Sequence, residues 1–299
     1  MPSRRTFLAS SAVSLGALAT GTTGAAESSA ATLSSAAQRA APAMSPGRIK
    51  QSVCRWCFGG IPYDDFCEMA KRVGLGAIDL VDQKDWALVQ KHGLAISTSN
   101  STSRRDFIPR GLNDRANHEL ILGELSAVIP AAAKAGIPNV IAMFGNKGTI
   151  TTEDGIAACA EGLAKIAPLA EKEGVTVILE MLNSRVDHHG FQGDTSAFGI
   201  AVAEKVSSPR VRLLYDIYHM QISEGDIIRS IRTNGKWFAH YHTAGNPGRN
   251  ELAADQELQY PAIAKAIADS GFTGWLAHEF IPKGDAEAGL MEAAKLCAV

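Results

Sequence analysis

Between residues 49 and 299, a short apolar run followed by a segment with helical spacing recurs eight times, and this alternation constrains the fold more than any other feature. The predicted strands cover 49–56, 77–81, 94–99, 139–144, 175–181, 211–216, 237–242 and 275–280. The predicted helices cover 62–73, 83–91, 113–135, 152–173, 195–206, 224–232, 260–270 and 287–297. Eight such units within roughly 250 residues predict an α/β fold, a single (β/α)8 TIM barrel. A doubly wound open sheet is the alternative, although no G-x-G-x-x-G motif follows the first strand.

Composition excludes some partners. The chain has 299 residues and a formal net charge of -2, which provides no general attraction to nucleic acid or to an anionic membrane. We therefore expect a small-molecule substrate, no nucleic acid and no membrane, and a homo-oligomer is compatible with the composition. The five cysteines do not form a disulfide pattern. We interpret Cys54 and Cys57 as small buried side chains rather than as a redox pair.

The N-terminus indicates export. Residues 3–8, Ser-Arg-Arg-Thr-Phe-Leu, match the twin-arginine pattern S-R-R-x-F-L, and a weakly apolar run follows. A disordered basic tail is the alternative interpretation. We predict a twin-arginine signal segment over 1–30, a flexible linker over 31–47 and the catalytic barrel over 48–299. The expected location is the periplasm or the secreted fraction.

Four strands in succession end in residue types that bind metals. The fifth to eighth predicted strands finish at Glu180, Asp216, His242 and Glu279. Active sites of barrels lie at the C-terminal ends of the strands, so these side chains should converge. Three carboxylates and one imidazole would repel or lose solvation unless a divalent cation bound them. This donor set favours Mn²⁺ or Mg²⁺, with Co²⁺ or Zn²⁺ as alternatives. Any one of the four residues alone is more often a helix cap or a salt-bridge partner.

Four segments carry a family resemblance. LEMLNSRVD (179–187), YDIYHMQ (215–221), AGNPGRNE (244–251) and GWLAHEFIP (274–282) together resemble the hydroxypyruvate isomerases. These belong to the xylose-isomerase-like barrels, which also include ketose 3-epimerases and endonuclease IV. The resemblance implies that Glu180, Asp216, His242 and Glu279 bind the metal. It also implies that Glu180 and Glu279 act as acid and base. Hydroxypyruvate isomerases often have Gln at the third position, and His242 is closer to the ketose epimerases.

The resemblance implies an aldose–ketose type isomerase. It would interconvert hydroxypyruvate and tartronate semialdehyde through an enediolate, by proton transfer next to a carbonyl. The alternatives are a ketose 3-epimerase or a keto-sugar lyase that uses the same enolisation, and a non-catalytic sugar-binding barrel. A nuclease like endonuclease IV would need more histidines on the first four strands.

The substrate-binding candidates are His219, Arg249, Glu251 and Trp56. His219 resembles the substrate-contacting histidine of the family, and Arg249 would meet a carboxylate or an enediolate oxygen. Glu251 would orient Arg249 or His219, and Trp56 would form a wall of the pocket. Each has a structural alternative. His219 could be a loop histidine bonded to backbone, and Arg249 a plain surface arginine. Glu251 could be a solvated loop carboxylate, and Trp56 could pack in the core. We expect His188 and His189 to face solvent, and His240 to support His242 from one layer deeper.

Overall fold

A computed structural model describes residues 47–299 of the chain. The predicted signal segment and nearly all of the predicted linker lie outside the described residues. The helices alternate with strands along the chain, as predicted. The strands are β1 (Lys50–Cys54), β2 (Ala77–Asp79), β3 (Ala95–Ile96), β4 (Ser99–Asn100), β5 (Asn139–Met143), β6 (Thr176–Glu180), β7 (Val211–Asp216), β8 (Phe238–Thr243) and β9 (Trp275–His278).

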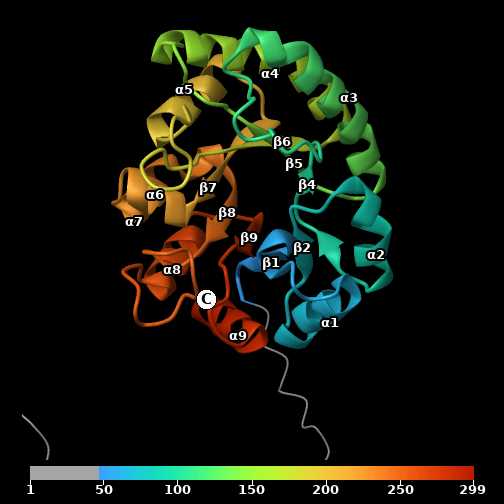
Figure 1. The fold of residues 1–299 in the computed structure, drawn as a ribbon, viewed down its shortest axis with the longest axis vertical. Coiled ribbons are helices and arrows are strands. Elements are labelled where there is room, and N and C mark those ends of the chain that lie inside the picture. The colour runs from blue at the N-terminus through green and yellow to red at the C-terminus, as the bar shows by residue number, and fades with distance from the viewer. Residues whose placement is uncertain (1–46) are drawn as a thin grey trace, which may run out of the picture. The chain divides into compact units, whose positions relative to one another are not determined.

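The helices form a layer outside the strands (Figure 1). They are α1 (Tyr63–Val73), α2 (Trp86–Lys91), α3 (His118–Lys134), α4 (Thr152–Glu173), α5 (Ser196–Val206), α6 (Ile217–Ser223), α7 (Ile227–Asn234), α8 (Tyr260–Asp269) and α9 (Ala286–Leu296). Short 3₁₀ turns occupy Arg55–Phe58, Gln83–Asp85, Arg115–Asn117 and Gly235–Trp237. Among the described helices, none combines the length and apolar composition needed to span a bilayer.

Local sequence signals explain where α4 begins and ends. The Thr151 side chain accepts a hydrogen bond from the Asp154 backbone N–H at the start of the helix. At the other end Gly174 adopts a left-handed conformation with φ of 72°, which a residue without Cβ tolerates best. The predicted range 152–173 is therefore identical to the observed helix.

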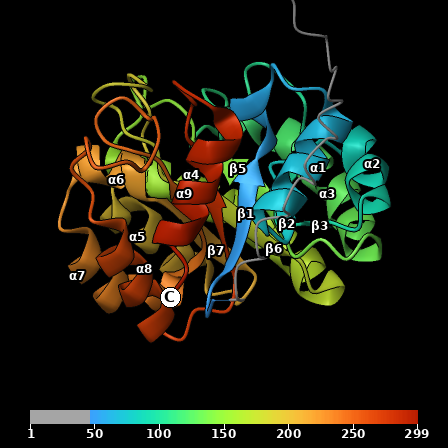
Figure 2. The same ribbon diagram turned by 90° about the horizontal axis from the view of Figure 1, so that it is seen from below.

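The strands are all parallel and close into a barrel, which confirms the predicted fold. Their order is β3-β2-β1-β9-β8-β7-β6-β5-β4. The two ends of this order, β3 and β4, lie three residues apart in sequence, between Ile96 and Ser99, and a parallel bridge joins Val81 to Ser99. Viewed from a perpendicular direction, the strands run through the interior between the helices (Figure 2). The barrel places the C-terminal ends of all strands at one rim, where a site can be built.

Two elements differ from the prediction. The third predicted strand, 94–99, is two short pieces, β3 and β4, because the chain passes from pairing with β2 to pairing with β5. The helix predicted over 224–232 is preceded by α6, which the sequence analysis missed. Asp216 explains α6, because its carboxylate accepts the His219 backbone N–H and caps the helix directly after β7.

Candidate metal centre and active site

The structure brings the four predicted metal ligands together at the barrel rim. Glu180 and Asp216 are the last residues of β6 and β7, His242 is the penultimate residue of β8, and Glu279 follows β9. One donor atom from each lies within 4.8 Å of the other three, and all four side chains are buried. Parallel registers produce this convergence: Asp216 of β7 lies beside His242 of β8. The cluster joins residues that are far apart in sequence.

His242 directs Nδ1 into the cluster. This nitrogen lies 2.9 Å from Glu279 Oε2, 3.4 Å from Glu180 Oε1 and 4.0 Å from Asp216 Oδ2. The three carboxylates therefore gather around Nδ1, so that one imidazole nitrogen lies among carboxylate oxygens. That donor set suits a hard or borderline divalent cation.

The electrostatics of the cluster fit a bound cation. Burial raises the pKa of Asp216 to about 7 and also raises the pKa of Glu180, because both carboxylates are removed from water. Glu180 Oε1 is buried and has no hydrogen-bond partner among the described residues. An unpaired buried carboxylate oxygen is costly unless a cation or a donor reaches it. A divalent ion held by Glu180, Asp216, His242 and Glu279 would stabilise the ionised carboxylates and give Glu180 Oε1 a partner.

Glu279 has a different environment from Glu180. Burial opposes ionisation of Glu279, but the charges of His242 and Arg249 and a hydrogen bond from Trp56 hold its pKa well below the usual range. Trp56 Nε1 donates to Glu279 Oε1 over 2.7 Å. The two carboxylates thus differ in proton affinity, with Glu180 above and Glu279 below the ordinary value. Such a difference is typical of an acid–base pair.

Arg249 lies against the cluster, as the sequence predicted. Its Nη2 donates to Glu279 Oε2 and lies 3.5 Å from Asp216 Oδ2. The guanidinium also packs between the rings of Trp56 and Tyr218, with its central carbon 5.3 Å from each ring centroid. Ion pairs on one side and aromatic faces on the other fix the orientation of a planar guanidinium.

His219 completes the polar side of the site. Its Nε2 lies 2.7 Å from Arg249 Nη1, and its Nδ1 lies 2.6 Å from Asn183 Nδ2. Burial, followed by the charge of Arg249, lowers the pKa of His219 well below 6.5, so the ring is neutral at physiological pH. Asn183, which the sequence analysis did not select, therefore helps to hold a substrate-binding candidate in place.

A cavity of about 370 Å³ adjoins the cluster. Its polar lining includes Glu180, Glu279, His219 and Arg249, and Trp56 contributes to the wall, as expected. The remaining wall is mainly apolar, with Leu80, Phe107, Ile108, Ile141, Met143 and Leu182. A few convergent polar groups in an apolar cleft are typical of a small-molecule site.

Two expectations differ from the geometry. Glu251 makes no hydrogen bond or ion pair with Arg249 or His219; its Oε1 accepts the backbone N–H groups of Lys283 and Gly284, over 2.7 and 3.1 Å. It therefore holds the loop after β9 rather than the substrate site. His188 lines the cavity and is half-buried rather than fully exposed, and its ring centroid lies 5.3 Å from that of His219. His189 is exposed, as predicted.

Sequence reasoning missed one buried acidic residue beside the cluster. Asp79, at the end of β2, is fully buried and its Oδ2 lies 2.9 Å from His242 Nε2. The sequence offered a signal, because Asp79 interrupts the apolar run of residues 77–81. A charge inside a buried strand needs partners. Which partners it has depends on the closure of the barrel.

Relatives of known activity match part of the chain. The 2-oxo-tetronate isomerase of Cupriavidus necator is 33% identical over 130 residues, which cover 44% of this chain and 49% of that protein. The hydroxypyruvate isomerase of Escherichia coli is 30% identical over 134 residues, which cover 45% of this chain and 51% of that protein. The chain thus spans about half the length of these curated relatives in the alignments.

Similarity of fold extends over most of the chain. The crystal structure of a family 2 AP endonuclease from Brucella melitensis superimposes with a TM-score of 0.73 at 22% identity, covering 83% of this chain and 99% of that one. Residues 67–298 match the family described as Xylose isomerase-like TIM barrel. With the closed parallel barrel, this match over most of the sequence shows that the chain belongs to the xylose isomerase-like TIM barrel family.

Proposed function

We propose that the protein is a metal-dependent isomerase that interconverts hydroxypyruvate and tartronate semialdehyde through an enediolate. One observation carries the proposal: a single cavity is lined by both acid–base candidates, Glu180 and Glu279, and by the guanidinium of Arg249. Proton transfer between two carbons of an α-hydroxy ketone needs an acid and a base, which Glu180 and Glu279 would provide. The guanidinium of Arg249 suits the carboxylate of hydroxypyruvate. The matches to the Cupriavidus and Escherichia isomerases support this reaction class.

Glu180, Asp216, His242 and Glu279 would hold the metal, which would polarise the substrate carbonyl and acidify the adjacent C–H. The residues of the chain do the rest. Glu180 Oε1, which has no hydrogen-bond partner among the described residues, is free to accept the C3 proton of hydroxypyruvate. Return of a proton to C2, with a hydroxyl proton moving between the two oxygens, gives tartronate semialdehyde. The mainly apolar cavity wall would limit the access of water while the proton is held.

Arg249 and His219 orient the substrate in this scheme. The guanidinium is held by its ion pairs with Glu279 and Asp216, and Nη1 lies next to His219. A substrate carboxylate or enediolate oxygen at this point would receive N–H donors whose orientation is already set. Neutral His219 adds a hydrogen-bonding group without adding charge.

A second reaction has a specific observation in its favour. A cavity of about 370 Å³ holds more than the seven non-hydrogen atoms of hydroxypyruvate, and a ketohexose also fits within that volume. His242 at the third ligand position agrees with the ketose 3-epimerases. Enolisation by the same two carboxylates would then epimerise a ketose, or eliminate a substituent from a keto sugar.

A substrate panel with and without chelator tests the proposal. Protein purified without chelator should contain a divalent metal, and EDTA should remove its activity until Mn²⁺ or Mg²⁺ is restored. In ²H₂O, turnover of hydroxypyruvate should place deuterium at C2 of the product. Turnover of ketoses with hydroxypyruvate untouched would replace the isomerase by the epimerase. No bound metal and no activation by either ion would refute metal dependence.

Substitution of the proton acceptor separates an enzyme from a sugar-binding barrel. Glu180→Gln should abolish turnover and weaken Mn²⁺ binding, because a charged ligand is replaced by a neutral amide. Glu153→Gln is the matched control, since Glu153 is an exposed residue in the first turn of α4. Carbohydrate binding that survives in Glu180→Gln, with no turnover by the wild type, would favour the non-catalytic barrel.

We also propose export through the twin-arginine pathway to the periplasm or beyond. The proposal is supported by the Ser3–Leu8 sequence, which lies outside the described residues. Fractionation of cells that express the full chain should recover it in the periplasm. Arg4→Lys combined with Arg5→Lys should retain it in the cytoplasm, and unchanged fractionation of this variant would contradict the pathway.

A further inference from the structure

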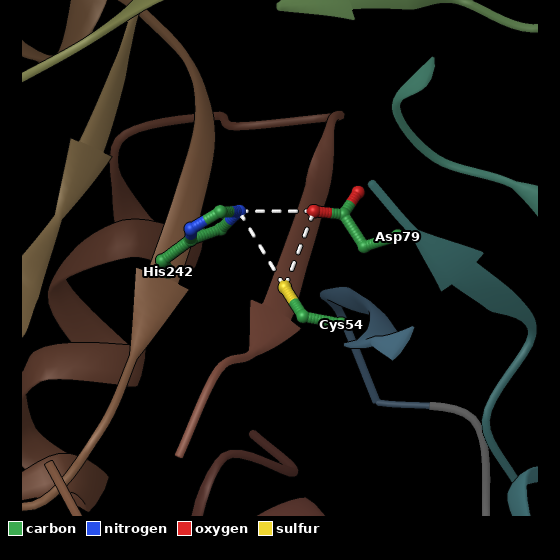
Figure 3. Close-up of side chains that lie close together, drawn as sticks. All are labelled: Cys54, Asp79 and His242. Atoms are coloured by element: carbon green, nitrogen blue, oxygen red, sulfur yellow. Dashed lines mark hydrogen bonds and ion pairs between the residues drawn. The ribbon is translucent and has the colours of Figure 1, made fainter. Parts of the chain in front are cut away.

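Asp79 lies directly behind the proposed metal centre, in a cluster of polar groups inside the barrel. Figure 3 shows its carboxylate facing the imidazole of His242 and the thiol of Cys54. Oδ2 lies 2.9 Å from His242 Nε2, and Cys54 Sγ donates to it over 3.5 Å. Oδ1 accepts a hydrogen bond from Ser97 Oγ and lies 3.2 Å from His240 Nε2. All of these side chains are fully buried.

The hydrogen bonds of Asp79 show its role as an acceptor. Oδ1 accepts from Ser97 Oγ and Oδ2 accepts from Cys54 Sγ. Each carboxylate oxygen has two lone pairs and can accept a further hydrogen bond. His242 Nε2, which lies 2.9 Å from Oδ2, is therefore placed to donate one to Asp79.

The two nitrogens of His242 face different surroundings. Nε2 meets Asp79, whereas Nδ1 meets Glu279, Glu180 and Asp216. A neutral imidazole has one N–H and one lone pair. A metal ion bound by Nδ1 would take its lone pair and leave the N–H on Nε2, facing Asp79; without the ion, Nδ1 lies at hydrogen-bond distance from Glu279 Oε2 and can carry a proton as well. Histidines that bind metals commonly donate their other N–H to a carboxylate, which fixes both tautomer and ring orientation.

We propose that Asp79 is a positioning residue, which fixes His242 as the Nε2–H tautomer so that Nδ1 binds the metal. The inference rests on the proposed metal centre. It adds a residue from β2, whereas the four proposed ligands come from β6 to β9 or directly follow them. Ser97 donates a hydrogen bond to the Asp79 carboxylate, and His240 Nε2 lies 3.2 Å from it, so the arrangement extends from β8 through β2 to the segment after β3.

A second metal ion is the competing explanation of the same residues. Donor atoms of Cys54, Asp79 and His242 also lie within 4.8 Å of one another. Both clusters use His242, however, and two ions would require both of its nitrogens as ligands, with the imidazole fully deprotonated. The 2.9 Å separation of Nε2 from Asp79 Oδ2 is that of a hydrogen bond. The geometry therefore favours one ion and one Asp79–His242 hydrogen bond.

Calorimetric titration of the full metal-free chain with Mn²⁺ tests the role of Asp79. The wild type should bind one ion. Asp79→Asn should bind one ion with a Kd increased about 10- to 100-fold, because a carboxylate behind a metal-bound histidine has an effect of this size. Cys54→Ala is the matched control: it keeps the Asp79–His242 pair, so its Kd should stay within about threefold of the wild type.

Nitrogen NMR of the ¹⁵N-histidine-labelled wild type loaded with Zn²⁺ provides a readout that needs no Asp79 variant. His242, assigned with His242→Gln, should show a proton on Nε2 and a metal-bound Nδ1. A proton on Nδ1 would overturn the inference, even if Asp79→Asn does not fold.

The outcomes separate this inference from the proposed function. Wild-type Mn²⁺ binding with an unchanged Kd in Asp79→Asn leaves the metal centre intact and overturns only the role of Asp79. Two ions per wild-type chain, falling to one in Cys54→Ala, would establish the second site instead. No Mn²⁺ binding by the wild type would remove the metal centre, and the role of Asp79 with it.

Discussion

Trp56→Phe should impair catalysis while the protein stays folded. Trp56 Nε1 is the hydrogen-bond donor to Glu279 Oε1, at 2.7 Å, while Oε2 is paired with His242 and Arg249. Phenylalanine keeps an aromatic ring beside Arg249 but leaves a buried carboxylate oxygen without its donor. A hydrogen bond to a charged group contributes about 1.5–3 kcal/mol. If the bond is made in the transition state, kcat/KM should fall roughly 10- to 100-fold, since about 1.4 kcal/mol corresponds to a factor of ten.

The folded state should lose little beyond this one hydrogen bond. Trp56 is 48% exposed, so the substitution removes only a modest area of buried apolar surface. Initial rates over a range of substrate concentrations at saturating Mn²⁺ give kcat/KM, and thermal unfolding gives Tm. Trp237→Phe is the control, because Trp237 stacks on Arg212 and Lys236 and lies in no contact with the site. A kcat/KM within twofold of the wild type would refute the assignment of this hydrogen bond to catalysis.

Three further predictions concern stability. Gly111→Ala should reduce the free energy of unfolding by at least about 1–3 kcal/mol, because its Cβ would lie 2.2 Å from the backbone of the two residues that follow β5. Gly123→Ala, where a Cβ on α3 would meet no atom within 4 Å, should be neutral or stabilising. Equal urea midpoints for the two variants would contradict the predicted steric clash at Gly111. Hydrogen bonds to two α1 carboxylates raise the pKa of His92, so the stabilisation is present below pH 6.5 and is lost as pH rises through the folded-state pKa. His92→Gln should therefore lower Tm more at pH 6 than at pH 9, unlike His189→Gln, whose ring bonds only to a backbone carbonyl; an equal effect at both pH values would argue against this. Tyr260→Phe should lower stability by about 1–3 kcal/mol in urea titration, because its buried hydroxyl bonds to both backbone groups of the residue after β8; an unchanged midpoint would count against it.

The sequence alone determined the barrel and the group of candidate metal ligands at its rim. Both depend on short-range patterns: the alternation of strand and helix along the chain, and a Glu, Asp or His at the end of each late strand. In a parallel barrel every strand ends at the same rim, so position within a strand is enough to place a side chain. Glu180, Asp216, His242 and Glu279 could be grouped for that reason without knowledge of any contact.

Only the tertiary structure decided what surrounds those four candidate residues. Asp79 and His242 are 163 residues apart, and Trp56 and Glu279 are 223 apart. Their contacts depend on how β1 and β2 pair as the barrel closes. The hydrophobic periodicity of a single element carries no information about this pairing. Glu251 shows the same limit, because its neighbourhood in sequence suggested the substrate while its carboxylate binds the loop after β9. Hydrophobic periodicity specifies which face of an element is buried, and packing across the barrel specifies which buried polar groups meet.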